Sequence, residues 1–331
     1  MGMKEFIIRR TIQTVIIFFI MITFNFFLFR IMPGDPTAIL VGNPNITQET
    51  RERIIQQFGL DKPLWMQYIL YIRELFRGDL GVSFYFTGEP VVKIILGQRM
   101  INTLVLMGSA TALSVLIGFI TGVVSAWRRG TKLDISGLII SIVFFSTPSF
   151  WLGLVILLVA GYYLHLIPLG GTITRGLAHA NVFHYIADYL HHLIAPMITL
   201  TLVLYGGYYL MMRNSMLETL TQEFIVTAKA KGLPEKRIMF KHAARNAMLP
   251  LVSMVAVNAA LIVGGAIVTE TVFSWHGIGS LMFLAVASKD YPVLQGIFLI
   301  ISITVLLANF IADILYAVSY THLTLPTTER V

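Results

Sequence analysis

Six stretches of this chain contain no Asp, Glu, Lys or Arg, and each is long enough, or nearly so, to cross a bilayer as a helix. They are residues 11–29, 101–126, 135–174, 189–212, 246–269 and 291–312. Apolar residues make up 56% of the 331 residues and charged residues only 12%, about half the share usual in soluble globular proteins. A soluble fold with so few charges could not cover its own surface. We therefore expect an integral membrane protein.

The third stretch, residues 135–174, is long enough for two crossings, and the positions of Lys and Arg decide between one and two. A single crossing, kinked or broken at Pro148, places residues 1–10, 128–132 and 213–245 on one side, with three, three and seven cations. Cytoplasmic loops are rich in Lys and Arg. The pattern thus predicts six helices with both termini in the cytoplasm. The first helix is interpreted as an uncleaved anchor, since no small-residue cleavage site follows it.

These spans predict an all-α protein with an outer cap between the first two membrane helices. We expect an N-terminal transmembrane anchor over residues 1–30, an extracytoplasmic cap over 31–99, and a five-helix core over 100–318. Within the cap, the sequence predicts a short helix between Thr47 and Gly59 and a second from Trp65 to Phe76 with an apolar face. Residues 319–331 are interpreted as a non-native tail, because they supply no cation until Arg330.

Several kinds of chemistry are excluded by what the chain lacks. With no cysteine, it has no disulfide, thiolate metal site or cysteine nucleophile. No Gly-Lys dipeptide occurs, so the phosphate-binding loop of nucleotide hydrolases is absent. The histidines, such as neighbouring His191 and His192, lack the ligand spacing of a metal site. The net charge of +7 comes from loops between spans, and we expect no nucleic-acid binding, no bound cofactor and no catalytic residues.

Two further functional classes are weighed against the polar residues of the spans. An ion-coupled carrier would need several acids near mid-membrane, whereas Asp313 lies near the cytoplasmic end of the sixth span. Structural capping or subunit contact is the favoured role of Asp313. A membrane-embedded enzyme would need a convergent nucleophile, base or metal ligands, and none occurs at usable spacing.

The second span carries small residues at four-residue intervals. They are Ala110, Ser114, Gly118, Gly122 and Ala126. On a helix this spacing forms one flat ridge that lets another backbone approach closely. Helix packing is favoured here over substrate binding.

The cytoplasmic loop of residues 213–248 carries the most informative local pattern. Glu218–Lys231 is predicted to be a helix, Gly232 its left-handed C-terminal cap, and Pro234 the first turn of a second helix. The plain alternative is a basic helix held at anionic headgroups. That alternative does not explain why Ala228, Ala230 and Gly232 remove bulk from one region, as close contact with a partner protein would require.

At these residues the chain resembles the membrane permease subunits of bacterial and archaeal ATP-binding-cassette importers, in the dipeptide, oligopeptide and nickel branch. The loop carries Ala228-Lys-Ala-Lys-Gly232-Leu233, followed by His242-Ala-Ala-Arg245-Asn246-Ala-Met-Leu-Pro250. Further similar motifs are Gly34-Asp35-Pro36, Gly78-Asp-Leu-Gly-Val-Ser83, Pro148-Ser-Phe-Trp-Leu-Gly153 and Thr269-Glu-Thr-Val-Phe-Ser-Trp275. In contrast, the Asp-Pro-Arg tail usual in this branch is missing after Ala317.

The resemblance implies a MetI-like transmembrane domain and a role as half of the transmembrane pathway for di- or oligopeptides in a prokaryotic cell membrane. It implies four kinds of partner: a second homologous permease subunit, two ATPase subunits that bind ATP and Mg, an extracytoplasmic substrate-binding protein, and the lipid bilayer around the spans. The expected ATPase-coupling residues are Glu223, Ala228, Ala230, Gly232, Leu233 and Arg237. Within the family, nickel, glutathione or an oligosaccharide are alternative cargoes.

Overall fold

The computed structural model describes residues 3–31, 48, 52, 55, 59, 61–86 and 88–323. Most of the expected cap helix between Thr47 and Gly59, like the Gly34-Asp35-Pro36 motif, lies outside the described residues. The described residues are almost entirely helical. They form two compact units: one runs to Ile101 and resumes at Gly277, and the other comprises Asn102–His276.

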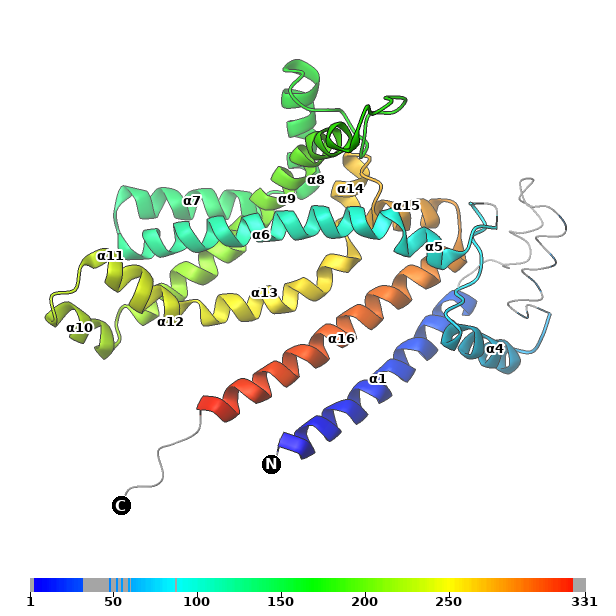
Figure 1. Cartoon of the computed structure of the whole chain (residues 1–331), viewed down its shortest axis with the longest axis horizontal. Coiled ribbons are helices and arrows are strands. Elements are labelled where there is room, and N and C mark those ends of the chain that lie inside the picture. Colours follow the sequence, from blue (N-terminus) through cyan, green and yellow to red (C-terminus); the bar gives the residue numbers. More distant parts are fainter. Residues whose placement is uncertain are drawn as a thin grey trace. The chain divides into compact units, whose positions relative to one another are not determined.

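The first unit combines the beginning and the end of the chain. Its elements are α1 (Met3–Ile31), α4 (Leu64–Phe76), α5 (Val91–Leu96), α15 (Ile278–Ala287), α16 (Tyr291–Leu323) and the first residues of α6 (Gln98–Trp127). Helices α1 and α16 pack along each other (Figure 1). The expected helix from Trp65 to Phe76 is confirmed as α4, which begins one residue earlier, directly after Pro63. The core lies where α5, α15 and α16 meet, and Val91, Ile95, Leu281 and Ile297 are almost fully buried there.

Asp290, just before α16, organises the loop that precedes α5. Its carboxylate accepts hydrogen bonds from the backbone N–H groups of Phe84 and Tyr85, both at 3.1 Å, and from the hydroxyl of Ser83. Asp290 is only 1% exposed, so these bonds replace the water that the charge loses on burial. The motif that ends at Ser83 therefore has a structural role, since it joins the cap to the last helix.

The second unit contains the central helices. They are α6, α7 (Lys132–Ser146), α8 (Ser149–Ile156), η1 (Leu157–Tyr163), α9 (Val182–Thr219), α10 (Glu223–Ala230), α11 (Glu235–Arg237), η2 (Ile238–Ala244), α12 (Arg245–Ala247), α13 (Leu249–Leu261), η3 (Ile262–Gly264) and α14 (Ile267–Val272). Helix α7 runs along α9 (Figure 1), and α13 also contacts α9.

The small residues of α6 lie against α9. A β-carbon on Gly118 would lie 2.8 Å from Cβ of Tyr208, and one on Gly122 would lie 2.9 Å from Cβ of Met212. Ser114 donates its hydroxyl hydrogen to the carbonyl oxygen of Thr201 at 3.1 Å. The flanking alanines of the stripe, Ala110 and Ala126, are at most 1% exposed. Helix α6 thus meets α9 along the whole stripe, at a separation that larger side chains would prevent.

The long third segment is broken at Pro148. Helices α7 and α8 meet at an angle of 99°, because proline lacks the N–H needed to continue the helix and restricts Thr147 before it to an extended conformation. Among the described residues, four helices are long and apolar enough to cross a membrane, and there are up to six if each bent pair is one span. The predicted six spans correspond to that upper count.

The two units divide the chain differently from the expected organisation. Helix α16 packs with α1 in the first unit, and it continues to Leu323, past the predicted end at residue 312. Residues 319–323 of the expected tail continue this helix, and the remainder lies outside the described residues. The division into anchor, cap and core remains a prediction about function.

Candidate coupling site

Helix α10 is a short element after the longest helix of the second unit. Helix α9 ends at Thr219, a turn follows, and α10 begins at Glu223. The prediction of one continuous helix over Glu218–Lys231 is therefore wrong at its beginning. The turn is closed by the N–H of Gln222, which bonds the carbonyl oxygen of Thr219 at 3.1 Å. This change of direction lets Ile225 reach the core of the unit.

The C-terminal end of α10 follows the prediction. Gly232 has a φ of 67°, in the left-handed region, and its N–H donates to the carbonyl oxygen of Lys229 at 2.9 Å. No atom lies within 4 Å of where a β-carbon would stand. Pro234 directly precedes α11, and α11, η2 and α12 then form a second helical stretch from Glu235 to Ala247. Two short helices joined at Gly232 thus form the predicted knuckle.

One face of α10 is buried. Ile225 is 0% and Ala228 is 5% exposed, and both join a core cluster with residues of α6, α9, η2, α12 and α13. The other buried members are Val123, Ala126, Tyr208, Met212, Met216, Ile238, Ala243, Ala244, Ala247 and Leu251. Leu233 packs against this cluster and is partly buried. This corrects the expectation that Ala228, Ala230 and Gly232 share one exposed region, because the small side chain of Ala228 faces the helices of its own unit.

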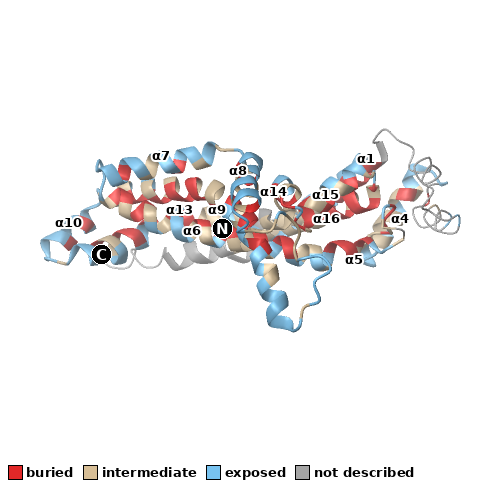
Figure 2. Ribbon diagram, turned by 90° about the horizontal axis from the view of Figure 1, so that it is seen from above, coloured by how far each residue is buried: buried red, intermediate tan, exposed pale blue. Residues whose placement is uncertain are grey.

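The opposite face of α10 is exposed and mixed in character (Figure 2). It presents Phe224 and Val226, which are 40% and 63% exposed, beside Glu223 and Ala230. Arg237 is exposed on the second short helix. Residues 223–245 carry six cations and two acids: Lys229, Lys231, Lys236, Arg237, Lys241 and Arg245 against Glu223 and Glu235. Exposed apolar side chains in a segment rich in cations are suited to contact with another protein.

A buried ion pair links three helices close to α10. Arg213 of α9 donates to Asp134 of α7 through Nε at 2.7 Å and through Nη2 at 2.8 Å. Ser125 of α6 donates to the same carboxylate at 2.5 Å and lies 2.5 Å from the hydroxyl oxygen of Tyr209. Ser125 is adjacent to Ala126 of the core cluster, and Arg213 is adjacent to Met212. The ion pair thus holds α6, α7 and α9 together directly beside the residues that contact α10.

Sequence reasoning missed this ion pair. Asp134 was placed just before a charge-free stretch, and Arg213 was counted as one cation of the cytoplasmic loop. The two residues are 79 positions apart. No spacing rule connects such positions, so only the packing of α7 on α9 reveals them as partners.

The motif from Thr269 to Trp275 has a packing role within the second unit. The Trp275 side chain is fully buried, and its indole N–H donates to the carbonyl oxygen of Asn102 at 3.1 Å. Buried Glu270 accepts a hydrogen bond from the hydroxyl of Thr103 at 3.0 Å. These bonds fasten the segment after α13 to the beginning of α6.

His179 of the loop before α9 and His192 of α9 itself lie close to Asp188 of α9. The Asp188 carboxylate accepts from the backbone N–H of Thr174 at 2.8 Å and lies 3.1 Å from Nε2 of His179 and 3.4 Å from Nδ1 of His192. Across the part of the chain that the structure describes, no three His, Cys, Asp or Glu side chains form a group that could hold a metal ion. The bonds of Asp188 fold the loop onto α9.

Taken together, the long apolar helices, the closely packed pair α6 and α9 and the protruding helix α10 define a multi-pass membrane protein of the transporter permease class. Residues 114–324 match the family described as binding-protein-dependent transport system inner membrane component, and residues 3–106 match the N-terminal part of the same kind of component. The chain belongs to this family. The resemblance to permease subunits of ATP-binding-cassette importers is thereby confirmed, and the chain is a membrane permease subunit, not an ATPase.

Named relatives cover nearly the whole chain. The oligopeptide transport system permease protein AppB of Bacillus subtilis is 36% identical over 96% of this chain and 98% of its own length. The dipeptide transport system permease protein DppB of Escherichia coli is 34% identical over 96% and 97%, respectively. The fold is similar to a solved inward-facing structure of the MetNI methionine ABC transporter, with a TM-score of 0.54 and 18% identity over 70% of this chain and 99% of that one. The predicted MetI-like fold is thus confirmed.

Proposed function

We propose that this chain is one of two permease subunits of a peptide importer and that α10, with the turn at Gly232, is the contact for an ATPase subunit. Peptide as cargo is supported by the names of the relatives, which are oligopeptide and dipeptide permeases. The observation that carries the coupling site is the division of α10 into a face buried in the bundle and a face left exposed. A helix of this kind can bind a partner and move the bundle with it.

The route of coupling follows from the contacts of α10. Displacement of the exposed face, with Phe224 and Val226, is passed through buried Ile225 and Ala228 to Val123 and Ala126 of α6 and to Met212 and Met216 of α9. The ion pair of Asp134 and Arg213 brings α7 into the same motion. Protein interiors are close-packed, so small displacements at one surface are transmitted rather than absorbed.

Energy for transport would come from the partner subunits. ATP and Mg bind there, whereas this chain would bind neither. Closure of the ATPase pair draws two knuckles together, one from each permease, and opens the pathway outward. Peptide then enters from an extracytoplasmic binding protein, and hydrolysis resets the assembly. This cycle requires two discrete arrangements of the helices, each favoured by a different ligand state.

The proposed orientation places both termini, the loop 128–132 and the coupling loop in the cytoplasm of a prokaryotic cell. It is supported by the cations of these three segments. Arg128, Arg129 and Lys132 lie within six positions of Asp134, and residues 223–245 of the coupling loop carry six cations.

Co-purification with candidate ATPase subunits of the same organism tests the coupling site. Wild type is compared with Gly232→Asp and with the control Gly176→Asp. Both glycines have positive φ, 67° and 77°, and open space at the β-carbon, so the two substitutions impose similar backbone strain. We expect Gly232→Asp to lose the ATPase and Gly176→Asp to retain it.

Two results would contradict the proposal in different ways. Equal retention by all three proteins would remove α10 as the contact site while leaving the importer assignment intact. If wild type retains no ATPase under conditions where each subunit is folded, the proposed assembly itself fails.

A further inference from the structure

Helix α4 lies against a membrane-spanning helix at membrane depth. The hydroxyl oxygen of Tyr68 is 2.7 Å from Oγ1 of Thr23, and the Tyr68 and Tyr71 rings lie 5.2 and 5.5 Å from the ring of Phe26. Thr23 and Phe26 belong to Glu5–Phe29, the stretch of α1 that is long and apolar enough to cross a bilayer. The contact face of α4 is therefore held beside the last turns of a span, not above them.

A second side of α4 is apolar and exposed among the described residues of the unit. Trp65, Ile69 and Phe76 are 61%, 53% and 65% exposed. Their spacing of four and seven residues places them on one side of a helix with 3.6 residues per turn. On the same helical projection, Arg73 follows Ile69 and then comes Arg77, on the side away from Tyr68. Around its circumference, α4 thus presents a contact to α1, an apolar stripe and then two cations.

This order is typical of a helix that lies in the membrane interface. Such helices bury an apolar face at the boundary between headgroups and acyl chains and keep cations at headgroup level. Tryptophan is enriched at that level because its ring is amphipathic. Glu74 contacts both arginines, at 2.8 and 3.3 Å, so the edge is polar with little net charge and suits zwitterionic as well as anionic headgroups.

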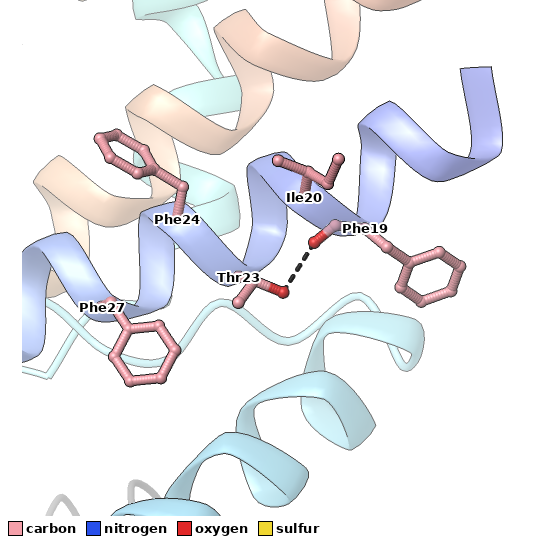
Figure 3. A pocket seen from close by; sticks show the side chains of 5 residues that line it. All are labelled: Phe19, Ile20, Thr23, Phe24 and Phe27. Carbon is pink, nitrogen blue, oxygen red and sulfur yellow. Dashed lines mark hydrogen bonds between the residues drawn. The ribbon is translucent and has the colours of Figure 1, made fainter. Parts of the chain in front are cut away.

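The surface of α1 beside this contact is hollowed. A groove of about 460 Å³ is lined by Phe19, Ile20, Thr23, Phe24 and Phe27 (Figure 3). Thr23 donates its hydroxyl hydrogen to the carbonyl oxygen of Phe19 in the same helix, at 2.7 Å. The lining of the groove is therefore apolar. The groove borders α4, because Phe27 stacks on Tyr68 at 6.4 Å between ring centroids.

We propose that α4 and the groove of α1 form one phospholipid-binding surface. An acyl chain lies in the groove, Trp65, Ile69 and Phe76 enter the boundary between headgroups and chains, and Arg73 and Arg77 lie at the phosphates. We infer a lipid occupant because the groove continues the exposed apolar side of α1, a helix long and apolar enough to span a bilayer, and because Arg73 and Arg77 border the stripe at its far edge. The inference rests on α1 as a span. Only the choice of the outer leaflet rests on the proposed orientation.

Spin-label accessibility tests this surface directly. The chain has no cysteine, so Ile69→Cys on the stripe, Phe24→Cys in the groove and Asp61→Cys as an exposed polar control each give a single labelling site. The full chain, purified with its associated subunits, is reconstituted in phosphatidylcholine and phosphatidylglycerol vesicles. Collision rates of each label are measured with oxygen, which concentrates in lipid, and with a water-soluble nickel chelate.

We expect labels at 69 and 24 to collide several-fold more with oxygen than with nickel, and the label at 61 to show the reverse. Low collision with both reagents at 69 and 24 would mean that another protein subunit covers the surface, and would overturn the proposal. Nickel exceeding oxygen at 69 would place the stripe in water and would also overturn it. The readout depends on neither ATP hydrolysis nor transport, so failure here is separate from failure of the proposed function.

Discussion

Arg213 holds Asp134 through two parallel hydrogen bonds, from Nε at 2.7 Å and from Nη2 at 2.8 Å, inside a protein with few charges elsewhere in its spans. The Asp134 side chain is 3% exposed and that of Arg213 is 12% exposed. Such a fork-to-carboxylate pair fixes distance and orientation together. It joins α7 and α9, and through Ser125 also α6, at the end of the unit that carries α10.

Breaking this pair from one side should be costly. Arg213→Ala leaves the Asp134 carboxylate buried without its partner, which we expect to lower the free energy of unfolding by about 3–5 kcal/mol. Replacing both, with Arg213→Met and Asp134→Leu, should cost much less, since neither charge remains. Thermal unfolding in detergent measures both. A double variant as unstable as the single one would show that the cost does not come from an unpaired Asp134 carboxylate.

The close approach of α6 and α9 predicts an unequal response at two glycines of one helix. Gly118→Ala brings a β-carbon to 2.8 Å from Cβ of Tyr208 and 2.9 Å from the backbone nitrogen of Tyr209. The backbone must shift, at a cost of about 1–3 kcal/mol. Gly108→Ala meets no atom within 4 Å and should stabilise by about 1 kcal/mol through helix propensity. Equal melting temperatures for the two variants would contradict this packing.

Substitutions at two adjacent residues of α10 should affect different properties: protein stability at Ile225 and retention of an ATPase subunit at Val226. Ile225→Ala removes a fully buried side chain and should cost about 2–5 kcal/mol. Faster tryptic cleavage at Lys229 or Lys231 would report the loosened helix. Val226→Ala, at a 63% exposed position, should change stability by less than about 0.5 kcal/mol but weaken retention of an ATPase subunit. The reverse assignment of the two effects would mean that α10 packs with its other face inward.

A substitution at Asp313 distinguishes a peptide importer from an ion-coupled carrier. Its carboxylate pairs with Arg10 at 2.7 Å, and the two side chains are 30% and 39% exposed, so the pair should contribute only about 0.2–1 kcal/mol. We expect Asp313→Asn to leave ATP-dependent uptake of a labelled dipeptide unchanged in reconstituted vesicles. Loss of uptake together with a lost response to a proton gradient would favour the carrier.

The sequence allowed the spans, α4 and the turn at Gly232 to be predicted, because each depends on local composition or on one residue's backbone preference. Gly232 adopts the expected left-handed conformation, and the break at Pro148 follows from its missing N–H. Periodicity carries no information on direction after a break. The angle of 99° and the turn between Thr219 and Glu223 are set by packing instead.

Contacts between residues far apart in the sequence could not be predicted from local sequence patterns. Asp134 and Arg213, or Ser83 and Asp290, look like ordinary loop or helix-end residues until helices distant in sequence are brought together. Ala228 is a related case. Its small size predicts a close neighbour, but size alone does not tell whether that neighbour is another protein or the chain's own α6 and α9.

The glycine contacts of α6 with α9 restrict how a passage for cargo can open. Two helices in backbone contact at Gly118 and Gly122 cannot slide or separate without losing that contact along several turns. They should therefore move together as one rigid pair, and the proposed coupling helix α10 packs against the same pair. Any opening must then occur along other borders of the bundle, such as that of α13, whose Val252 and Val257 are 51% and 57% exposed. Cross-links between α6 and α9 should leave transport intact, whereas cross-links that fix α13 to its neighbours should stop transport.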